Sequence, residues 1–61
     1  MWIEVTATSS GQKFAINFDH VTDFYPMAAG SLLVRSQGNR VEVKEPYEAI
    51  LELLKVPRNL S

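Results

Sequence analysis

The stretch LLVRSQGNRVEVK, from Leu32 to Lys44, decides the fold, and an apolar-periodic run from Glu45 to Leu54 follows it directly. Ser31–Ser36 and Arg40–Lys44 are rich in β-branched and apolar residues, which favours strands. The residues between them, 37–39, include a glycine and an asparagine, which tolerate the positive φ angles of tight hairpin turns. The sequence therefore predicts a β-hairpin that leads straight into a helix.

The predicted helix begins at Glu45-Pro46, because proline suits the first helical position, where its missing N–H would be unpaired anyway. Its apolar residues follow the i, i+3, i+4, i+7 spacing of an amphipathic helix. They are Tyr47, Ile50, Leu51 and Leu54. Val56-Pro57 ends the helix, since the residue before proline avoids the helical region. We expect residues 55–61 to form a frayed tail.

The N-terminal half predicts a second hairpin. Trp2–Thr8 and Lys13–Phe18 alternate with a period of two, and the turn between them contains Gly11. Phe24-Tyr25 is expected to be extended, and Pro26 restricts that strand to a short or edge position because proline cannot donate to a ladder. We therefore predict a single α+β domain over residues 1–61. It has one antiparallel sheet of four to five strands, built from two β-hairpins, with one C-terminal amphipathic helix packed on one face.

Composition limits the function classes. The net charge is −1 and the chain contains no cysteine, which removes disulfides and thiolate metal sites. Apolar runs fall far short of the ~20 residues that span a bilayer, so we expect a soluble cytoplasmic protein without membrane insertion. A chain of 61 residues buries only about 60% of its unfolded surface. Self-association is then the expected source of additional stability.

The alternation also predicts which side chains are buried. The expected core consists of Ile3, Val5, Phe14, Ile16, Val21, Leu32, Val34, Val41, Val43, Ile50, Leu51 and Leu54. The same alternation places Trp2 and Leu33 outward, while Phe24, Tyr25 and Met27 lie beside a loop and an edge strand. Two interpretations remain open for these five residues: they complete the core at the sheet ends, or they form an interface with another protein, where such residues are enriched.

Candidate chemistry is limited to His20, which has Asp19 and Asp23 nearby in the sequence. The side chains of adjacent residues diverge in most backbones, and a general base needs a positioned partner and a pocket. A solvated turn is therefore the preferred interpretation of this cluster. We predict no catalytic residue, no cofactor and no metal site, and thus a protein that is not an enzyme.

Basic residues give an alternative function. Arg35, Arg40 and Lys44 are predicted on one outward face of the C-terminal hairpin, and Lys13 can join them. Glu42 interrupts this set, as in the cross-strand charge lattices of solvated sheets. The alternative is a small nucleic-acid-binding regulator that contacts phosphates through these four residues. The absence of a basic excess makes nucleic acid the less favoured partner.

A family resemblance covers residues 1 to about 54. It is carried by Met1, Ile3, Val5 and Thr6, then Gly11, Phe14, Ile16 and Asn17, then Gly38, Val41, Val43, Lys44 and Glu45 before a helix. This order of residues resembles the small flagellar FlbD/SwrD-like proteins, which implies a short bacterial protein associated with flagellar gene clusters and motor function. Pro46 departs from the family, which often has a serine cap there. The last half is also similar to the strand–strand–helix end of LytTR-type DNA-binding domains, without their basic balance.

The leading hypothesis from the sequence is a non-enzymatic protein–protein interaction module. It self-associates as a homo-oligomer and docks onto a larger protein, for which the resemblance implies a flagellar partner. Trp2, Phe24, Tyr25, Met27 and Leu33 are the predicted interface residues.

Overall fold

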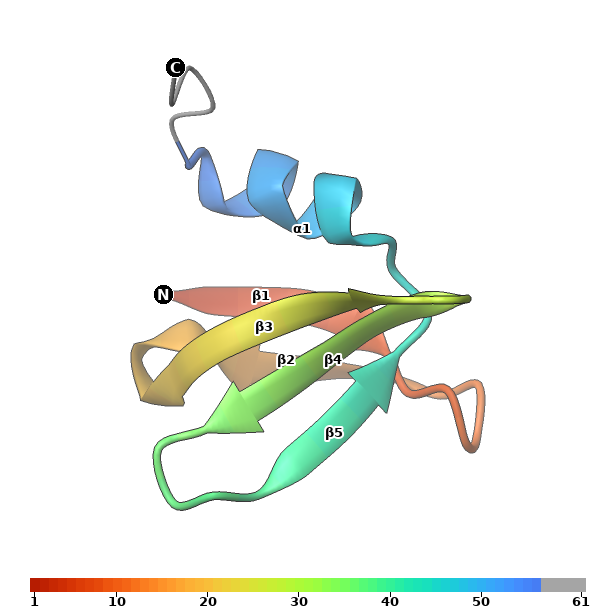
Figure 1. Ribbon diagram of the computed structural model, residues 1–61, viewed down its shortest axis with the longest axis horizontal. Coiled ribbons are helices and arrows are strands. Elements are labelled where there is room, and N and C mark those ends of the chain that lie inside the picture. The colour runs from red at the N-terminus through yellow and green to blue at the C-terminus, as the bar shows by residue number, and fades with distance from the viewer. Residues whose placement is uncertain (57–61) are drawn as a thin grey trace.

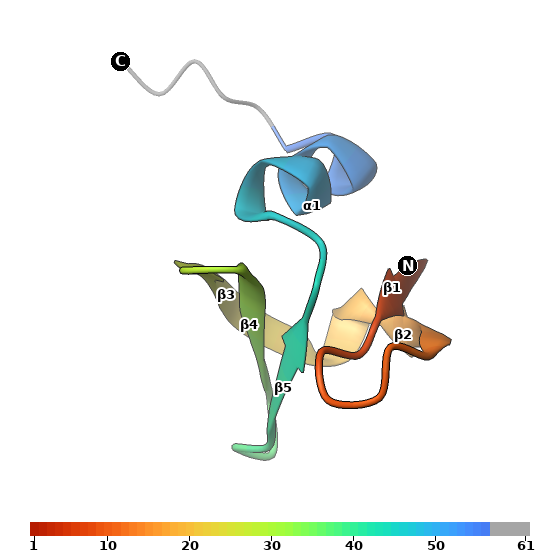
Figure 2. The same cartoon turned by 90° about the vertical axis from the view of Figure 1, so that its right-hand side faces the viewer.

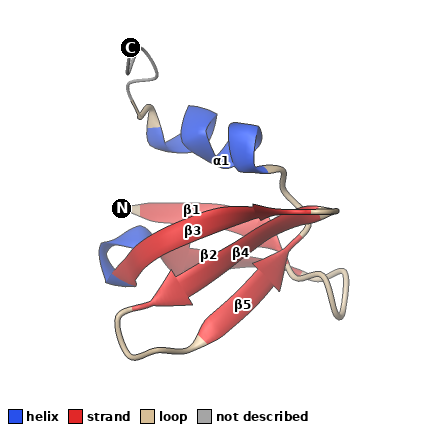
Figure 3. Ribbon diagram, in the orientation of Figure 1, coloured by secondary structure: helices blue, strands red, loops and turns tan. Residues whose placement is uncertain are grey.

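The computed structural model describes residues 1–56 and gives an α+β fold (Figures 1 and 3). The elements in chain order are β1 (Trp2–Thr6), β2 (Lys13–Asn17), the 3₁₀-helix η1 (Phe18–His20), β3 (Val21–Met27), β4 (Gly30–Arg35), β5 (Arg40–Val43) and α1 (Tyr47–Leu54). Both predicted hairpins are present as β1–β2 and β4–β5. The region around Phe24 is the edge strand of a three-stranded sheet, as Pro26 indicated, although it is longer than expected.

The prediction of one continuous sheet was wrong, because the strands form two antiparallel sheets. One contains β1 and β2, and the other has the order β3-β4-β5. They join at one corner, where Ala7 forms an isolated bridge with Val43 just after the end of β1. Two backbone bonds flank this bridge: Thr8 N–H donates to the Glu42 carbonyl at 3.0 Å, and Lys44 N–H donates to the Thr6 carbonyl at 2.8 Å. The chain at the end of β1 therefore pairs with β5 on the side away from β2, and the two sheets turn toward each other (Figure 2).

The core lies between the two sheets and the helix. Its buried apolar residues come from four strands and the helix: Ile3, Val5, Ile16, Leu33, Val43 and Ile50. Partly buried residues pack around them: Phe14, Phe18, Val21, Phe24, Val41 and Leu54. The rings of Phe18 and Phe24 meet edge-to-face at 6.0 Å, a favourable aromatic geometry. We refer to the side of the β3-β4-β5 sheet that carries Leu33 and Val43 as its inner face.

Helix α1 confirms the predicted amphipathic segment. Ile50 is fully buried, and the Tyr47 ring lies 5.2 Å from the Phe24 ring of β3. The helix ends at Lys55, which adopts the left-handed conformation with φ 56°. Lys55 N–H bonds back to the Glu52 carbonyl, and Val56 N–H bonds back to the Leu51 carbonyl, which satisfies the last turn. Of the predicted tail, residues 57–61 lie outside the described residues.

The loop between β2 and β3 is held by a local cap. Asn17 is the N-cap of η1, and its side-chain oxygen accepts a hydrogen bond of 3.0 Å from Asp19 N–H. Such a bond satisfies a backbone donor that the short helix leaves free. Within residues 1–56, no helix combines the length and the apolar character that crossing a membrane requires.

Candidate functional site

The five predicted interface residues do not share one environment. Trp2, Tyr25 and Met27 are exposed, with 69%, 50% and 43% of their surface accessible. Phe24 packs against the core between Phe18 and Tyr47, and Leu33 is fully buried. Leu33 and Phe24 therefore belong to the interior, whereas Trp2, Tyr25 and Met27 are free to contact a partner. Trp2 lies on the two-stranded sheet and the other two lie on β3, so they do not form one patch.

The prediction that Leu33 points outward was wrong, because the buried side of β4 carries Leu33 rather than Leu32 and Val34. Leu32, Leu33 and Val34 are all apolar, so either alternation gives an apolar face. Pairing with β5 decides it: Leu33 lies opposite Val41, and Ser31 lies opposite Val43. Since directly opposite residues share a face, burial of Val43 takes Ser31 and Leu33 inward with it. Leu32 and Val34, which were predicted in the core, lie on the other side of the sheet and are partly exposed.

We call that other side of the β3-β4-β5 sheet the outer face. It has two cross-strand rows, Tyr25–Leu32–Glu42 and Asp23–Val34–Arg40. Met27 follows Tyr25 on the same face at the end of β3. Figure 2 shows β1 and β2 on the opposite side of this sheet. The outer face therefore combines exposed apolar groups with charges of both signs.

Asp23 anchors one edge of the outer face. Its carboxylate accepts hydrogen bonds from the Thr22 hydroxyl and from the Tyr25 hydroxyl. The bonds from Thr22 and Tyr25 hold the pKa of Asp23 below its usual range. Conversely, the hydrogen bond to Asp23 and its negative charge raise the pKa of the Tyr25 phenol. The Tyr25 side chain is thus held along its own strand, with its ring lying over the outer face.

The four predicted phosphate-contacting residues are dispersed. Arg40 lies on the outer face, opposite Val34. Arg35 has the facing of Leu33 and projects from the inner face at the far end of β4. Lys13 is on β2, opposite Thr6, and the Lys44 ammonium lies near Gly11 at the β1–β2 turn. The structure therefore does not gather the four residues into one basic surface.

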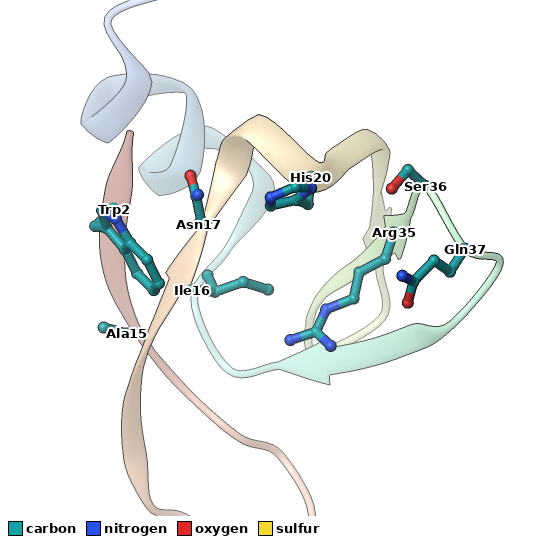
Figure 4. Close-up of a pocket in the computed structure, with 8 residues that line it drawn as sticks. All are labelled: Trp2, Ala15, Ile16, Asn17, His20, Arg35, Ser36 and Gln37. Carbon is teal, nitrogen blue, oxygen red and sulfur yellow. The ribbon is translucent and has the colours of Figure 1, made fainter.

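A small cavity opens where the two sheets separate, beside β2; we call it the β2 mouth. Its volume is about 310 Å³, and it is lined by Trp2, Ala15, Ile16, Asn17, His20, Arg35, Ser36 and Gln37. Figure 4 shows Trp2 and Ala15 on one side of β2, and Ile16, His20 and Arg35 on the other side. No sequence pattern predicts this cavity, because its lining comes from three segments that only the fold brings together.

His20 is the residue that sequence analysis singled out as a candidate base, and it lines the β2 mouth as the last residue of η1. It is exposed, and no hydroxyl or thiol is bonded to it within residues 1–56. In the same part of the chain, no three His, Cys, Asp or Glu side chains are grouped to hold a metal ion.

Comparison of the chain with protein-family models, with curated proteins and with solved structures finds no match. The resemblance to FlbD/SwrD-like proteins stays a prediction.

Proposed function

We propose that this protein is a non-enzymatic protein-interaction module that self-associates through the outer face of the β3-β4-β5 sheet. The observation that carries the proposal is the position of Leu32, which lies in one cross-strand row beside the exposed Tyr25, with Val34 in the next row. Sheets in small domains keep such a face polar unless it meets another surface.

The charges on the outer face support contact with a second copy. A twofold interface brings the same patch of both subunits together, so the patch must complement itself. On β5, Arg40 and Glu42 lie on the outer face two residues apart. Arg40 lies opposite the partly exposed Val34 of β4, and Asp23 of β3 lies in the same cross-strand row. Two such faces can therefore pair Arg40 of one copy with a carboxylate of the other, while Tyr25 and Leu32 exclude water between them.

The size of the core supports the same proposal. The buried apolar cluster within residues 1–56 consists of six side chains. A domain of this size buries a smaller fraction of its surface than a larger domain does, so its core contributes little surplus stability. Additional apolar burial at a subunit interface would stabilise the folded chain.

The test is sedimentation equilibrium of the wild-type protein and of Leu32→Lys, both checked for folding by circular dichroism. The wild type is expected to form dimers or larger assemblies at micromolar concentration, and Leu32→Lys is expected to be a folded monomer. The matched control is Gln12→Lys, which adds the same charge at an exposed position in the β1–β2 turn and should leave the assembly unchanged. A wild-type protein that stays monomeric at tens of micromolar and unfolds cooperatively would contradict the proposal.

A flagellar partner is a separate prediction, which rests on the resemblance in the sequence. Deletion of the gene from a flagellated host should then reduce swimming or swarming. Complementation with the Leu32→Lys variant asks whether that role needs the outer face. Unchanged motility after deletion would remove the flagellar assignment and leave the self-association test unaffected.

A further inference from the structure

One edge of β2 has no neighbouring strand within residues 1–56, since β2 pairs only with β1. Two backbone bonds fix which groups face that edge: Phe18 N–H donates to the Met1 carbonyl, and Ala7 N–H donates to the Gln12 carbonyl. Hydrogen-bonded pairs alternate in an antiparallel ladder, so Ile16 and Phe14 direct their backbone groups toward β1. The N–H groups of Lys13, Ala15 and Asn17 must then point away from β1, toward the free edge.

This free edge borders the β2 mouth, so a strand added to β2 would lie along the cavity. Alternate side chains of an added strand point to opposite faces. On one side they would meet Ile16, His20 and Arg35, and on the other side they would meet Trp2 and Ala15 (Figure 4). The two sides of the site therefore differ in chemistry, and each side selects its own type of residue.

The Arg35 side of the mouth is complementary to negative charge. Arg35 and His20 line it together with the polar Ser36 and Gln37, and none of the lining residues is acidic. The ion pair that the structure shows within residues 1–56 is between the Met1 amino group and Asp19, so the Arg35 guanidinium is not neutralised by a described carboxylate. A guanidinium presents a planar fork of donors that matches a carboxylate.

The Trp2 side of the mouth is complementary to apolar groups. Trp2 is 69% exposed, and its cross-strand partner on β2 is Asn17. Ala15 is the next residue of β2 on that face, and its small side chain leaves the indole accessible beside the free edge. Exposed tryptophan next to an open strand edge is a favourable anchor for an apolar side chain of an added strand.

We propose that β2 binds an extended, acidic segment of a partner protein as an additional strand. The segment alternates carboxylate residues, which face Arg35, with apolar residues, which face Trp2. Backbone bonds to Lys13, Ala15 and Asn17 supply the affinity, and the alternation supplies the specificity. This site uses the two-stranded sheet and the end of β4, so it is independent of the self-association surface on the outer face.

The test uses a six-residue peptide of alternating glutamate and valine, blocked at both ends, titrated into isotopically labelled full-length protein. The amide signals of Lys13, Ala15 and Asn17 and the indole N–H signal of Trp2 are expected to shift together. Arg35→Gln should weaken binding about tenfold, as expected for loss of a charge-assisted bond. Lys55→Gln, the matched control, removes one positive charge at the exposed end of α1 and should leave the affinity unchanged.

One further variant and two modified peptides separate backbone pairing from charge. Ala15→Pro removes an N–H that faces the free edge and is not bonded to β1, so the domain should fold while binding is lost. If this variant fails to fold, a peptide with proline at its centre makes the same test on the unmodified protein. A peptide with lysine in place of glutamate should bind at least tenfold more weakly than the glutamate peptide.

Several results would overturn the proposal. One is equal binding of the glutamate and lysine peptides. Another is an affinity that Arg35→Gln leaves unchanged. A third is a set of shifts confined to the outer face. Concentration-dependent shifts of Lys13, Ala15 and Asn17 without peptide would assign the edge to a second copy of the chain. Displacement of the glutamate peptide by an equal concentration of a single-stranded oligothymidine would assign Arg35 to phosphate.

Discussion

The carboxylate of Glu45 holds both the backbone N–H and the hydroxyl of Thr6, at 2.8 Å and 2.9 Å. The carbonyl of the same residue, Thr6, accepts a bond of 2.8 Å from Lys44 N–H. The Glu45 side chain thereby adds two hydrogen bonds to the backbone bonds that join β1 to β5, at the corner where the two sheets meet. Its own carbonyl accepts a bond of 2.7 Å from the buried Ser31 hydroxyl. Glu45 thus connects β1, β4 and the start of α1.

Replacing Glu45 with alanine should destabilise the domain by about 1–3 kcal/mol, because Thr6 N–H loses its partner in a partly buried position. Urea unfolding followed by circular dichroism measures this change. Glu4→Ala removes an exposed carboxylate from the outward side of β1 and should cost less than about 0.5 kcal/mol. Equal losses for the two variants would show that the bonds to Thr6 contribute nothing specific.

Stability should fall in acid partly through Glu45. Partial burial opposes its ionisation, but the two bonds from Thr6 and the positive charge of Lys13 outweigh burial and lower the pKa of Glu45 below its ordinary value of 4.5. The unfolded chain then binds this proton more readily, so the contribution is complete above the unfolded pKa and is lost as pH falls toward the lower folded pKa. The stability difference between wild type and Glu45→Gln should therefore shrink between about pH 5 and pH 3. A difference that grows in acid would contradict this assignment.

Leu33 and Leu32 test the facing of β4. Leu33→Ala should cost about 2–5 kcal/mol, because Leu33 is fully buried, and it could leave so small a domain unfolded. Leu33→Val removes one methylene and should cost about 1 kcal/mol, which keeps the comparison measurable. Leu32→Ala, with its partly exposed side chain, should cost less in the monomer while weakening self-association. If Leu32→Ala destabilised the monomer more than Leu33→Val, Leu32 rather than Leu33 would be the buried residue, as the sequence analysis predicted.

Gly30 and Gly38 both have positive φ, at 112° and 88°, but only one of them is crowded. A Cβ at position 30 would lie 2.0 Å from the Val43 carbonyl oxygen, whereas a Cβ at position 38 would meet nothing within 4 Å. Gly38→Ala should therefore cost only the backbone strain of about 1–2 kcal/mol. Gly30→Ala should cost clearly more, because the β3–β4 turn must also move away from β5. Similar unfolding midpoints for the two variants would contradict the close approach of Gly30 to β5.

Tyr25 should titrate at higher pH than an ordinary tyrosine. The hydrogen bond to Asp23 stabilises the neutral phenol, and the negative charge of Asp23 disfavours the phenolate, so both raise the pKa of Tyr25. In Asp23→Asn, the titration of Tyr25 measured by ultraviolet absorbance should move to lower pH. Tyr47→Phe isolates the signal of Tyr25. An unchanged titration would show that the contact between Tyr25 and Asp23 does not persist in solution.

Much of the architecture could be predicted from local patterns. The turn around Gly38 and the alternation of Val41 and Val43 predicted the β4–β5 hairpin, and the spacing of Tyr47, Ile50 and Leu54 predicted the helix. Exposure of Trp2 followed from alternation along β1. These features depend on residues close together in the chain, whose preferences act independently of the rest of the fold.

The candidate sites could not be predicted in this way. The β2 mouth combines Trp2, Ala15 and Arg35, and their proximity depends on how β1 bends toward β5. The outer face depends on which side of β4 is buried, and three consecutive apolar residues leave that choice open. The register between β4 and β5 decides which side of β4 is buried, because Ser31 lies opposite Val43 and both are buried.

The amino-acid sequence alone therefore determined where the hairpins turn and, to within about two residues, where the helix begins and ends, since backbone preferences and periodicity act within a few residues. Pro46, which was predicted at the first helical position, is instead the extended N-cap of α1. Only the tertiary structure decided that the strands divide into two sheets and that Leu33, rather than Leu32, is buried. The physical reason is that the facing of a strand is set by the partner strand across from it. Here β5 is held in place by bonds between residues distant in the chain: Thr6 N–H to the Glu45 carboxylate, Lys44 N–H to the Thr6 carbonyl and Thr8 N–H to the Glu42 carbonyl.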